Sequence, residues 1–362
     1  MDIAAVILGI IGIVSFAISL VLYIKTKEDR IKYLELQKKD GTGPNVVVIG
    51  GGTGQSIFLR GLKHYTENIT AIVTVADDGG GSGVLRADLG MLPPGDIRNC
   101  IMALANIEPT MNEVMQYRFE EGVLKGQSFG NLFLAAMNGL YGNFETAIYK
   151  IGQIFAITGR VLPVTLENID LIAKLDIGTI VRGESTIPKM VKSQKCKIEK
   201  ITLIPEDCRP LDEVISSIRG ADIIVMGPGS LYTSVIPNLI VPGVIESIKK
   251  SNAKKVYIPN VMTQPGETDG FNVLDHVRAL VNHTELGLID YVIVNNEKIL
   301  EPVSKKYEKD GAVQVLLDKE QKLQLRCMGI ETIESNLIEI KNDYIRHNAN
   351  KISEIIVNLA KN

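Results

Sequence analysis

Short apolar runs alternate along the chain with longer segments in which apolar residues recur every three or four positions. Runs of four or five such residues are typical of buried parallel strands, and the longer periodic segments are typical of the helices that join them. The pattern therefore predicts an α/β fold built on a doubly wound, mostly parallel sheet. The predicted strands are 46–49, 71–75, 223–226, 255–258 and 291–294.

Two other stretches depart from this alternation. Between about 160 and 205 the chain is rich in Val, Ile, Thr and Lys, with glycines at turn positions, which predicts a small antiparallel β insertion. Near the N-terminus, Gly41-Thr42-Gly43-Pro44 stops any helix that precedes it. We therefore divide the sequence into an N-terminal segment, 1–44, and one main domain, 45–362.

The N-terminal segment begins with an uncharged run, 3–24. As a helix this run would span roughly 33 Å, about the thickness of one hydrocarbon core. Basic residues follow it between 25 and 39, and such residues stay on the cytoplasmic side of a membrane. We predict an uncleaved transmembrane helix and a juxtamembrane stalk, with the main domain in the cytoplasm. A buried core helix is the alternative interpretation.

Composition narrows the classes of partner. Lys and Arg number 39 against 42 Asp and Glu, and the chain has no Trp, which argues against nucleic-acid binding. The four cysteines lie far apart and the four histidines form no metal-binding pair, which argues against a zinc site or a disulfide framework. His276 and His283, two turns apart on a predicted helix over 272–283, are expected to face solvent.

Each predicted strand stops at a polar or Gly-rich turn, and the carboxyl ends of strands in such a sheet form the ligand crevice. The turn over 50–56 precedes a predicted helix, so its glycines would let a phosphate approach the first N–H groups of that helix. It lacks the lysine of a Walker A loop. The turn over 227–234 adds three hydroxyls and a second set of donors, although a plain turn with a capping Ser explains part of it. Two such loops suit a diphosphate.

Charged residues accompany these turns. Asp77 follows the second strand, where Rossmann-like folds place the carboxylate that binds ribose hydroxyls. With Asp78 it could instead hold Mg²⁺, or it could cap the Gly79 turn. Asp96 is expected to cap a helix that runs through Asn106. Arg98, on that helix, could bind phosphate in a bidentate fork or form an ion pair with Asp88 or Glu108.

Six short motifs succeed one another along the chain, at 51–54, 75–83, 92–99, 130–132, 227–234 and 262–268. In this order they resemble the YvcK family, also called the gluconeogenesis factor, which is related to the CofD 2-phospho-L-lactate transferases. The similarity extends over about 45–360 and implies a Rossmann-like fold. It also implies a UDP-sugar-binding protein, with UDP-N-acetylglucosamine as the model ligand, that regulates cell shape and peptidoglycan wall synthesis under gluconeogenic growth and has no established reaction.

The resemblance further implies that Tyr307 and Arg346 contact the nucleotide. A Tyr ring can stack on uracil and a guanidinium can bind pyrophosphate. Without the resemblance, Arg346 would be a solvated position on an amphipathic helix predicted over 344–359.

The leading hypothesis is therefore a membrane-anchored UDP-sugar-binding regulator, and the alternative is a Mg²⁺-assisted phospho-group or nucleotidyl transferase of the CofD type. Mg²⁺ at Asp77 and Asp78 is the one metal considered. Expected partners are the nucleotide sugar, the membrane, wall-synthesis or signalling proteins and a second copy of the chain. The candidate ligand-binding residues are Gly51, Gly52, Thr53, Gly54, Asp77, Asp78, Asp96, Arg98, Asn99, Asn131, Gly227, Gly229, Ser230, Thr233, Ser234, Asn260, Tyr307 and Arg346.

Overall fold

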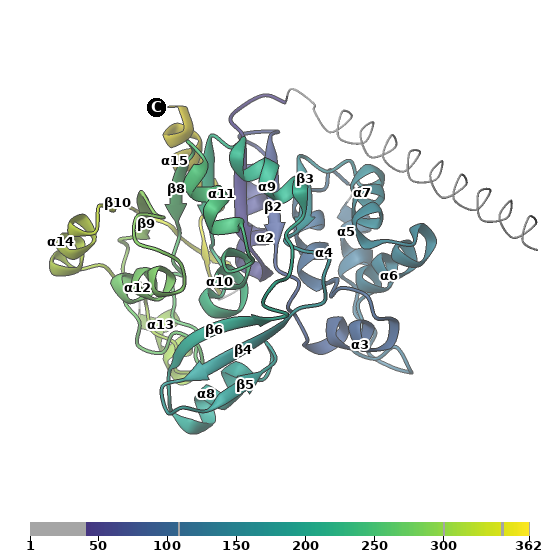
Figure 1. Cartoon of the computed structure of the whole chain (residues 1–362), viewed down its shortest axis with the longest axis horizontal. Helices are drawn as coiled ribbons and strands as arrows, with labels where there is room; N and C mark the ends of the chain where they lie inside the picture. Colours follow the sequence, from purple (N-terminus) through teal and green to yellow (C-terminus); the bar gives the residue numbers. More distant parts are fainter. Residues whose placement is uncertain (1–40, 108, 300, 342–343, 362) are drawn as a thin grey trace, which may run out of the picture. The chain divides into compact units, whose positions relative to one another are not determined.

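The computed structural model describes residues 41–361 except 108, 300 and 342–343 (Figure 1). The chain divides into two compact units, Met1–Gly41 and Thr42–Asn362, and the described residues beyond Gly41 belong to the second. The transmembrane helix predicted at 3–24 and the stalk after it lie outside the described residues. Within the described part, no single helix has the length and apolar composition to cross a membrane; one bent pair, Leu231–Leu239 with Val244–Lys250, meets that test jointly.

A seven-stranded parallel sheet forms the centre of the second unit, in the order β10-β9-β8-β7-β1-β2-β3. The chain winds outward from β1 to β3 and then, on the other side of β1, from β7 to β10. Strand order therefore reverses between β1 and β7, which is where doubly wound sheets bind ligands. The strands are β1 (Val46–Gly50), β2 (Ile69–Val73), β3 (Arg160–Pro163), β7 (Ile223–Met226), β8 (Lys254–Tyr257), β9 (Tyr291–Asn295) and β10 (Glu331–Ser335).

All five predicted strands lie in this sheet, which confirms the mostly parallel α/β fold. The apolar runs identified them because β1 and β7 are buried along their whole length. Edge strand β10 reads Glu-Thr-Ile-Glu-Ser and stays partly exposed, so its apolar pattern is weaker. The sequence interpretation placed Arg160–Pro163 in the antiparallel insertion. That placement is wrong, because β3 pairs in parallel with β2 and its Val161 and Leu162 are buried.

The predicted antiparallel insertion is present from residue 170 onward. β4 (Asp170–Leu175), β5 (Ile180–Arg182) and β6 (Ile198–Ile204) form a three-stranded sheet in the order β5-β4-β6. Buried and more exposed positions alternate along β4, as expected for a strand with one covered face. Helix α8 (Ile187–Gln194) lies between β5 and β6.

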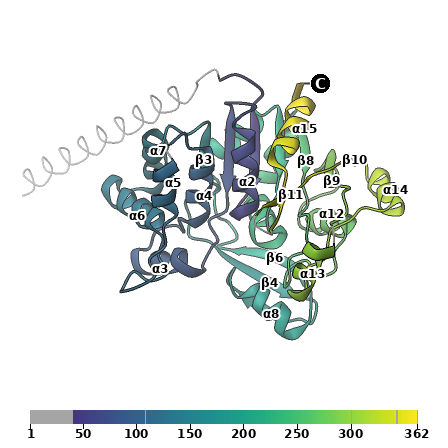
Figure 2. The same cartoon turned by 180° about the vertical axis from the view of Figure 1, so that it is seen from behind.

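Helices cover both faces of the parallel sheet. Helices α2 (Gly52–Leu62) and α15 (Ala349–Lys361) pack together on one face, where Figure 2 shows them in front of the strands. They approach closely at Gly61, where an added Cβ would lie 2.6 Å from the Cβ of Ala349. Helices α9 (Asp212–Arg219) and α11 (Val244–Lys250) pack together on the other face.

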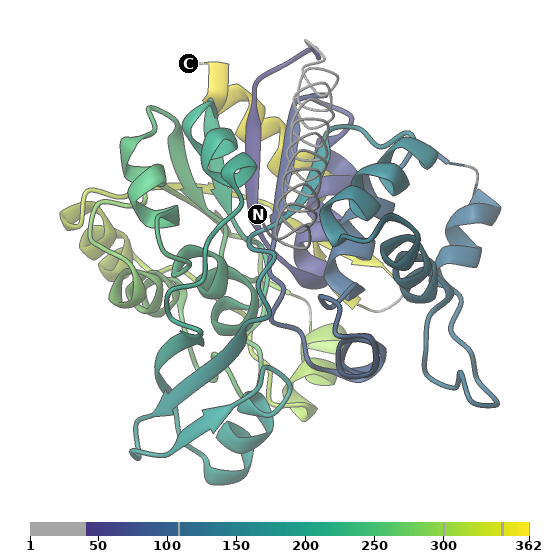
Figure 3. The same cartoon turned by 45° about the vertical axis from the view of Figure 1, so that its right-hand side comes forward.

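The remaining helices flank this arrangement, with α3 to α7 gathered beside β3 (Figures 1 and 3). A two-stranded antiparallel ribbon, β11 (Ile338–Lys341) and β12 (Tyr344–His347), precedes α15. The other elements are α3 (Gly80–Leu89), α4 (Gly95–Leu104), α5 (Pro109–Gln116), α6 (Phe129–Tyr141), α7 (Phe144–Ile154), the π-helix η1 (Leu231–Val235), α10 (Ile236–Leu239), α12 (Val273–His283), α13 (Glu301–Lys309) and α14 (Lys319–Cys327).

Two local expectations are wrong. The helix predicted over 344–359 begins only at Ala349, because Tyr344–His347 pairs with β11 and the Asn348 side chain accepts from Lys351 N at 3.0 Å. His276 and His283 do not face solvent. His276 is fully buried, and His283 Nε2 accepts from Ile201 N at 2.8 Å. The seven-residue spacing does place both on one face of α12, but that face packs inward, and burial lowers the pKa of both imidazoles.

Candidate functional site

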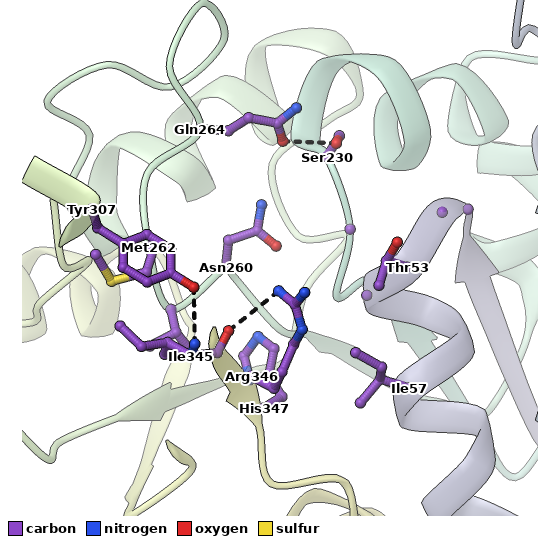
Figure 4. A pocket seen from close by; sticks show the side chains of 15 residues that line it. Thr53, Ile57, Ser230, Asn260, Met262, Gln264, Tyr307, Ile345, Arg346 and His347 are labelled. Carbon is purple, nitrogen blue, oxygen red and sulfur yellow. Dashed lines mark hydrogen bonds between the residues drawn. The ribbon is translucent and has the colours of Figure 1, made fainter. Parts of the chain in front are cut away.

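A cavity of about 270 Å³ opens where the turns after β1, β7 and β8 meet the C-terminal segment (Figure 4). Its volume is close to the lower end of the range for ligand pockets, about 300–1,000 Å³. Its position matches the reversal of strand order between β1 and β7. The lining residues are Gly51, Gly52, Thr53, Gly54, Ile57, Gly229, Ser230, Asn260, Val261, Met262, Gln264, Tyr307, Ile345, Arg346 and His347.

The first wall is the turn between β1 and α2. Gly52, at a φ of 68°, begins α2 and gives its N–H to the carboxylate of Asp96. The first N–H groups of a helix have no partner within the helix and carry partial positive charge. This turn also touches the turn after β7, since a Cβ on Gly54 would lie 2.8 Å from the carbonyl oxygen of Pro228. The predicted Gly-rich turn therefore presents a helix N-terminus to the cavity.

The second wall is the turn after β7, and the chain itself supplies an anion there. The carboxylate of Glu267 accepts from Tyr232 N at 3.2 Å and from the Thr233 hydroxyl at 3.0 Å, at the start of η1. Burial raises the pKa of Glu267 to about 7, and these donors oppose that rise. The N-terminus of η1, interpreted from sequence as a second phosphate site, is thus occupied by Glu267. Gly229 and Ser230 remain on the cavity wall.

The third wall comes from the turn after β8, α13 and β12. The Tyr307 hydroxyl accepts from Ile345 N at 2.8 Å, which ties α13 to β12. Figure 4 shows the Arg346 guanidinium directed into the cavity, with Thr53 and α2 on the other side. His347 lies beside it, and burial lowers its pKa to about 4, so this imidazole is neutral near pH 7. The positive charge at this wall is therefore that of Arg346.

A group of buried or partly buried carboxylates lies behind the first wall. A Cβ on Gly51 would lie 2.7 Å from Asp96 Oδ2. Burial, and then the charge of Asp77, raises the pKa of Asp96 to about 7 and that of Glu184 to about 8. Asp77 accepts from Gly79 N at 2.9 Å, the capping role considered from the sequence, and Asp78 accepts from Ser185 N at 2.8 Å.

Across the described ranges, no group of three or more His, Cys, Asp or Glu side chains has the arrangement needed to hold a metal ion. Both Asp77 and Asp78 already accept a backbone N–H, so they offer Mg²⁺ a reduced set of free oxygens. Mg²⁺ at these two residues stays a prediction.

Arg98 lies in a separate polar cluster. It is buried, and its guanidinium contacts the Ser128 hydroxyl and, at 2.8 Å, Asn99 Oδ1. These contacts replace the predicted ion pair with Asp88, and Glu108 lies outside the described residues. Asn131 joins the cluster by donating its N–H to Ser128 Oγ at 3.3 Å. Asp96, expected to cap α4, instead lies in its first turn and accepts from Gly52.

The cavity brings together half of the residues selected from sequence. Those on its lining are Gly51, Gly52, Thr53, Gly54, Gly229, Ser230, Asn260, Tyr307 and Arg346. Those outside the lining are Asp77, Asp78, Asp96, Arg98, Asn99, Asn131, Gly227, Thr233 and Ser234.

Comparison with known proteins shows the family to which the chain belongs. Residues 46–338 match the family model described as 2-phospho-L-lactate transferase CofD. A protein of Bacillus subtilis named gluconeogenesis factor is 47% identical over 322 residues, which cover 89% of this chain and 99% of that protein. The chain belongs to the gluconeogenesis factor family. A relative in Thermoanaerobacterium thermosulfurigenes is 57% identical over 317 residues, covering 88% of this chain and 97% of its own length.

The fold is also that of a crystal structure described as a member of the UPF0052 family. A crystal structure from Bacillus halodurans matches this chain with a TM-score of 0.82 at 48% identity, covering 86% of this chain and 99% of the other. The family resemblance drawn from the six motifs is confirmed by these matches.

Sequence reasoning missed several lining residues of this family member. Ile57, Ile345 and His347 are placed by α2 and β12, whose local patterns look like ordinary structural segments. Gln264 carried a signal, because it lies in the polar turn after β8 that also contains Asn260. Asn238 was missed too: its amide donates to Gly50 O at 2.8 Å and to Ser234 O at 2.7 Å, which fixes α10 to the end of β1.

Proposed function

We propose that this chain binds a UDP-sugar, such as UDP-N-acetylglucosamine, in the cavity and acts as a binding regulator of cell shape and wall synthesis during gluconeogenic growth. The observation that carries the proposal is the pairing of two positive elements across one cavity. The N-terminus of α2 forms one wall and the Arg346 guanidinium forms the wall opposite (Figure 4). Helix N-termini and arginine side chains are among the groups that commonly bind phosphates in proteins.

The remaining lining residues fit the other parts of a nucleotide sugar. Tyr307 presents its ring beside Met262, since its hydroxyl is held by Ile345 N, and this pair supplies an apolar surface for a base. The Asn260 amide offers both a donor and an acceptor, which suits the edge of uracil. Hydroxyls and amides along the Ser230 side suit a sugar. The regulatory role rests on the membership of the gluconeogenesis factor family.

A Mg²⁺-assisted transferase of the CofD type is the second candidate function. The observation that favours it is the presence of Asp96 directly behind Gly51, where burial and the charge of Asp77 raise the pKa of Asp96 and of Glu184. Carboxylates with raised pKa values next to a diphosphate site would bind an acceptor group. Incubation with UDP-sugar or GTP, Mg²⁺ and candidate acceptors, followed by mass spectrometry, supports this function if UMP, GMP or a new conjugate forms.

Calorimetric titration of the full chain with UDP-N-acetylglucosamine tests the leading proposal. We expect saturable binding that Tyr307→Ala and Arg346→Ala each weaken, because one removes the base surface and the other a charge at the diphosphate. Matched controls are Tyr141→Ala and Arg326→Ala, which change exposed side chains of the same types on α6 and α14. Absence of binding by the unchanged chain would refute the proposal.

A further inference from the structure

The hydroxyl of Ser230 is committed to a neighbour within the cavity wall. Ser230 Oγ donates to Gln264 Oε1 at 2.7 Å, and Gln264 Nε2 donates to Glu267 Oε1 at 2.7 Å. A serine hydroxyl has one hydrogen and two lone pairs. Once its hydrogen is given to Gln264, Ser230 has lone pairs left to offer to a ligand.

The direction of this chain of hydrogen bonds is set by Glu267. That carboxylate is buried and is surrounded by donors: Tyr232 N, the Thr233 hydroxyl and Gln264 Nε2. In its ionised form, which is favoured above its pKa of about 7, Glu267 accepts and does not donate, so the amide of Gln264 turns its nitrogen toward Glu267 and its oxygen toward Ser230. The opposite orientation would place two acceptors 2.7 Å apart. The backbone of Gln264 is fixed as well, because its N–H donates to the Thr268 hydroxyl at 2.8 Å.

This arrangement changes the role expected of Ser230. Its hydroxyl was interpreted from sequence as part of an anion-binding loop. A diphosphate oxygen accepts hydrogen bonds, however, and the hydrogen of Ser230 is already donated to Gln264. Figure 4 shows the Ser230–Gln264 pair on a different part of the wall from Arg346, with Asn260 between them. An acceptor placed away from the cation suits a hydroxyl group of the ligand.

We propose that Ser230 recognises a hydroxyl of the bound nucleotide sugar by accepting its hydrogen, and that Gln264 and Glu267 are positioning residues that hold Ser230 in this role. The inference deepens the proposed function and rests on it. The hydroxyl belongs either to the ribose or to the sugar, and the two sources are distinguished by the ligands used to test the inference.

The test measures dissociation constants of UDP, 2′-deoxy-UDP, 3′-deoxy-UDP and UDP-N-acetylglucosamine for the unchanged chain and for Ser230→Ala. A hydrogen bond of this kind corresponds to about fivefold in affinity. If the ribose hydroxyl is recognised, Ser230→Ala weakens UDP about fivefold and leaves one of the deoxy ligands unchanged. If the sugar hydroxyl is recognised, it weakens UDP-N-acetylglucosamine about fivefold and leaves UDP unchanged. Ser230→Thr, which keeps the hydroxyl, should restore the lost affinity.

Equal weakening of all four ligands would indicate a phosphate contact and overturn the inference, as would no weakening of any. Failure of the unchanged chain to bind any UDP compound would instead overturn the proposed function, and the inference with it.

Glu267→Gln tests whether Glu267 positions Ser230 through Gln264. An amide at 267 can donate to Gln264 Oε1, which lets Gln264 turn and donate to Ser230. In a variant that a thermal melt shows to be folded, we expect smaller differences in dissociation constant between UDP, its deoxy analogues and UDP-N-acetylglucosamine. If these differences are as large as in the unchanged chain, Glu267 does not position Ser230.

Discussion

The turns after β1 and β7 look alike in sequence and differ in structure. Each follows a central buried strand, carries glycines and leads into a helix. The N-terminus of α2 lines the cavity although Asp96 accepts its Gly52 N–H, whereas the N-terminus of η1 is closed by the Glu267 carboxylate. The positive end of a helix attracts an anion in both cases. A sequence motif therefore identifies where an anion is stabilised, but not whether the chain supplies that anion itself.

The two turns also depend on each other. A Cβ on Gly229 would lie 3.1 Å from Gly51 O, so the backbones are in contact at the reversal of strand order. Asp96 holds the Gly52 N–H from one side, and Glu267 holds Tyr232 and Thr233 from the other. The wall that Glu267 closes can thus serve as a rigid support for the wall that stays open to ligand.

The largest expected effect comes from removing the Glu267 carboxylate, the anion that the chain itself places at the N-terminus of η1. Glu267→Ala leaves several buried donors without their acceptor, and we expect it to lower the free energy of unfolding by about 3 kcal/mol, measured by urea denaturation. Because the variant opens the N-terminus of η1 as a further anion site, phosphate should raise its melting temperature more than that of the unchanged chain. The exposed Glu285→Ala serves as control. Equal stability of Glu267→Ala and the control would show that the carboxylate does not support this wall.

Arg346→Ala should remove the cation opposite the open turn. Hydrogen bonds to charged groups contribute about 1.5–3 kcal/mol, so we expect UDP-sugar affinity to fall by about 30-fold, measured by calorimetry. Arg346→Lys should recover part of the loss, since it keeps the charge but not the planar fork. Stability should change little, because the guanidinium's backbone contact, to Ile345 O, is long at 3.4 Å. Full affinity of Arg346→Ala would place the phosphates elsewhere.

The carboxylates behind the open turn should make stability depend on pH. The folded-state pKa of Asp96, about 7, lies above its ordinary value of 3.8, so the folded chain holds this proton more tightly than the unfolded chain. Stability from this group is therefore fully present below about pH 4 and is lost as the pH rises toward 7. Asp96→Asn should reduce the downward slope of unfolding free energy over this range by up to about 1.4 kcal/mol per pH unit. An unchanged slope in urea denaturation across this range would contradict the raised pKa.

The sequence predicted those elements that local patterns determine and missed those that depend on contacts distant along the chain. The five predicted strands are continuous apolar runs because they are buried on both faces, and that information is local. Strand β3 has the same local composition as the hairpins after it, and its parallel pairing with β2 is a long-range choice. The strand at Tyr344–His347 was missed for a related reason. Its sequence continues the helical periodicity of α15, but it pairs with β11 and forms a strand.

The site divides along similar lines. Gly51, Thr53 and Ser230 were found because a turn after a central strand must face the crevice. Tyr307 and Arg346 entered through the family resemblance, and the structure brings both to the cavity. The role of Glu267 could not be seen, since its partners Tyr232 and Thr233 lie more than 30 residues away along the chain. A residue that closes a site from within has no local pattern that marks it.

The smallest expected effect comes from adding a methyl group to a glycine in the turn after β1. Gly52 has a φ of 68°, and a Cβ there would meet Ser234 Oγ only at 3.9 Å, so the space for a methyl group exists. Gly52→Ala should therefore cost about 1 kcal/mol through backbone strain alone, measured by urea denaturation. Gly54→Ala is the contrast, because its Cβ would lie 2.8 Å from the Pro228 backbone and would push the two turns apart. If Gly52→Ala lowers UDP-sugar affinity far more than stability, the methyl group blocks the ligand's approach to α2; if both fall together, the strain has displaced the turn.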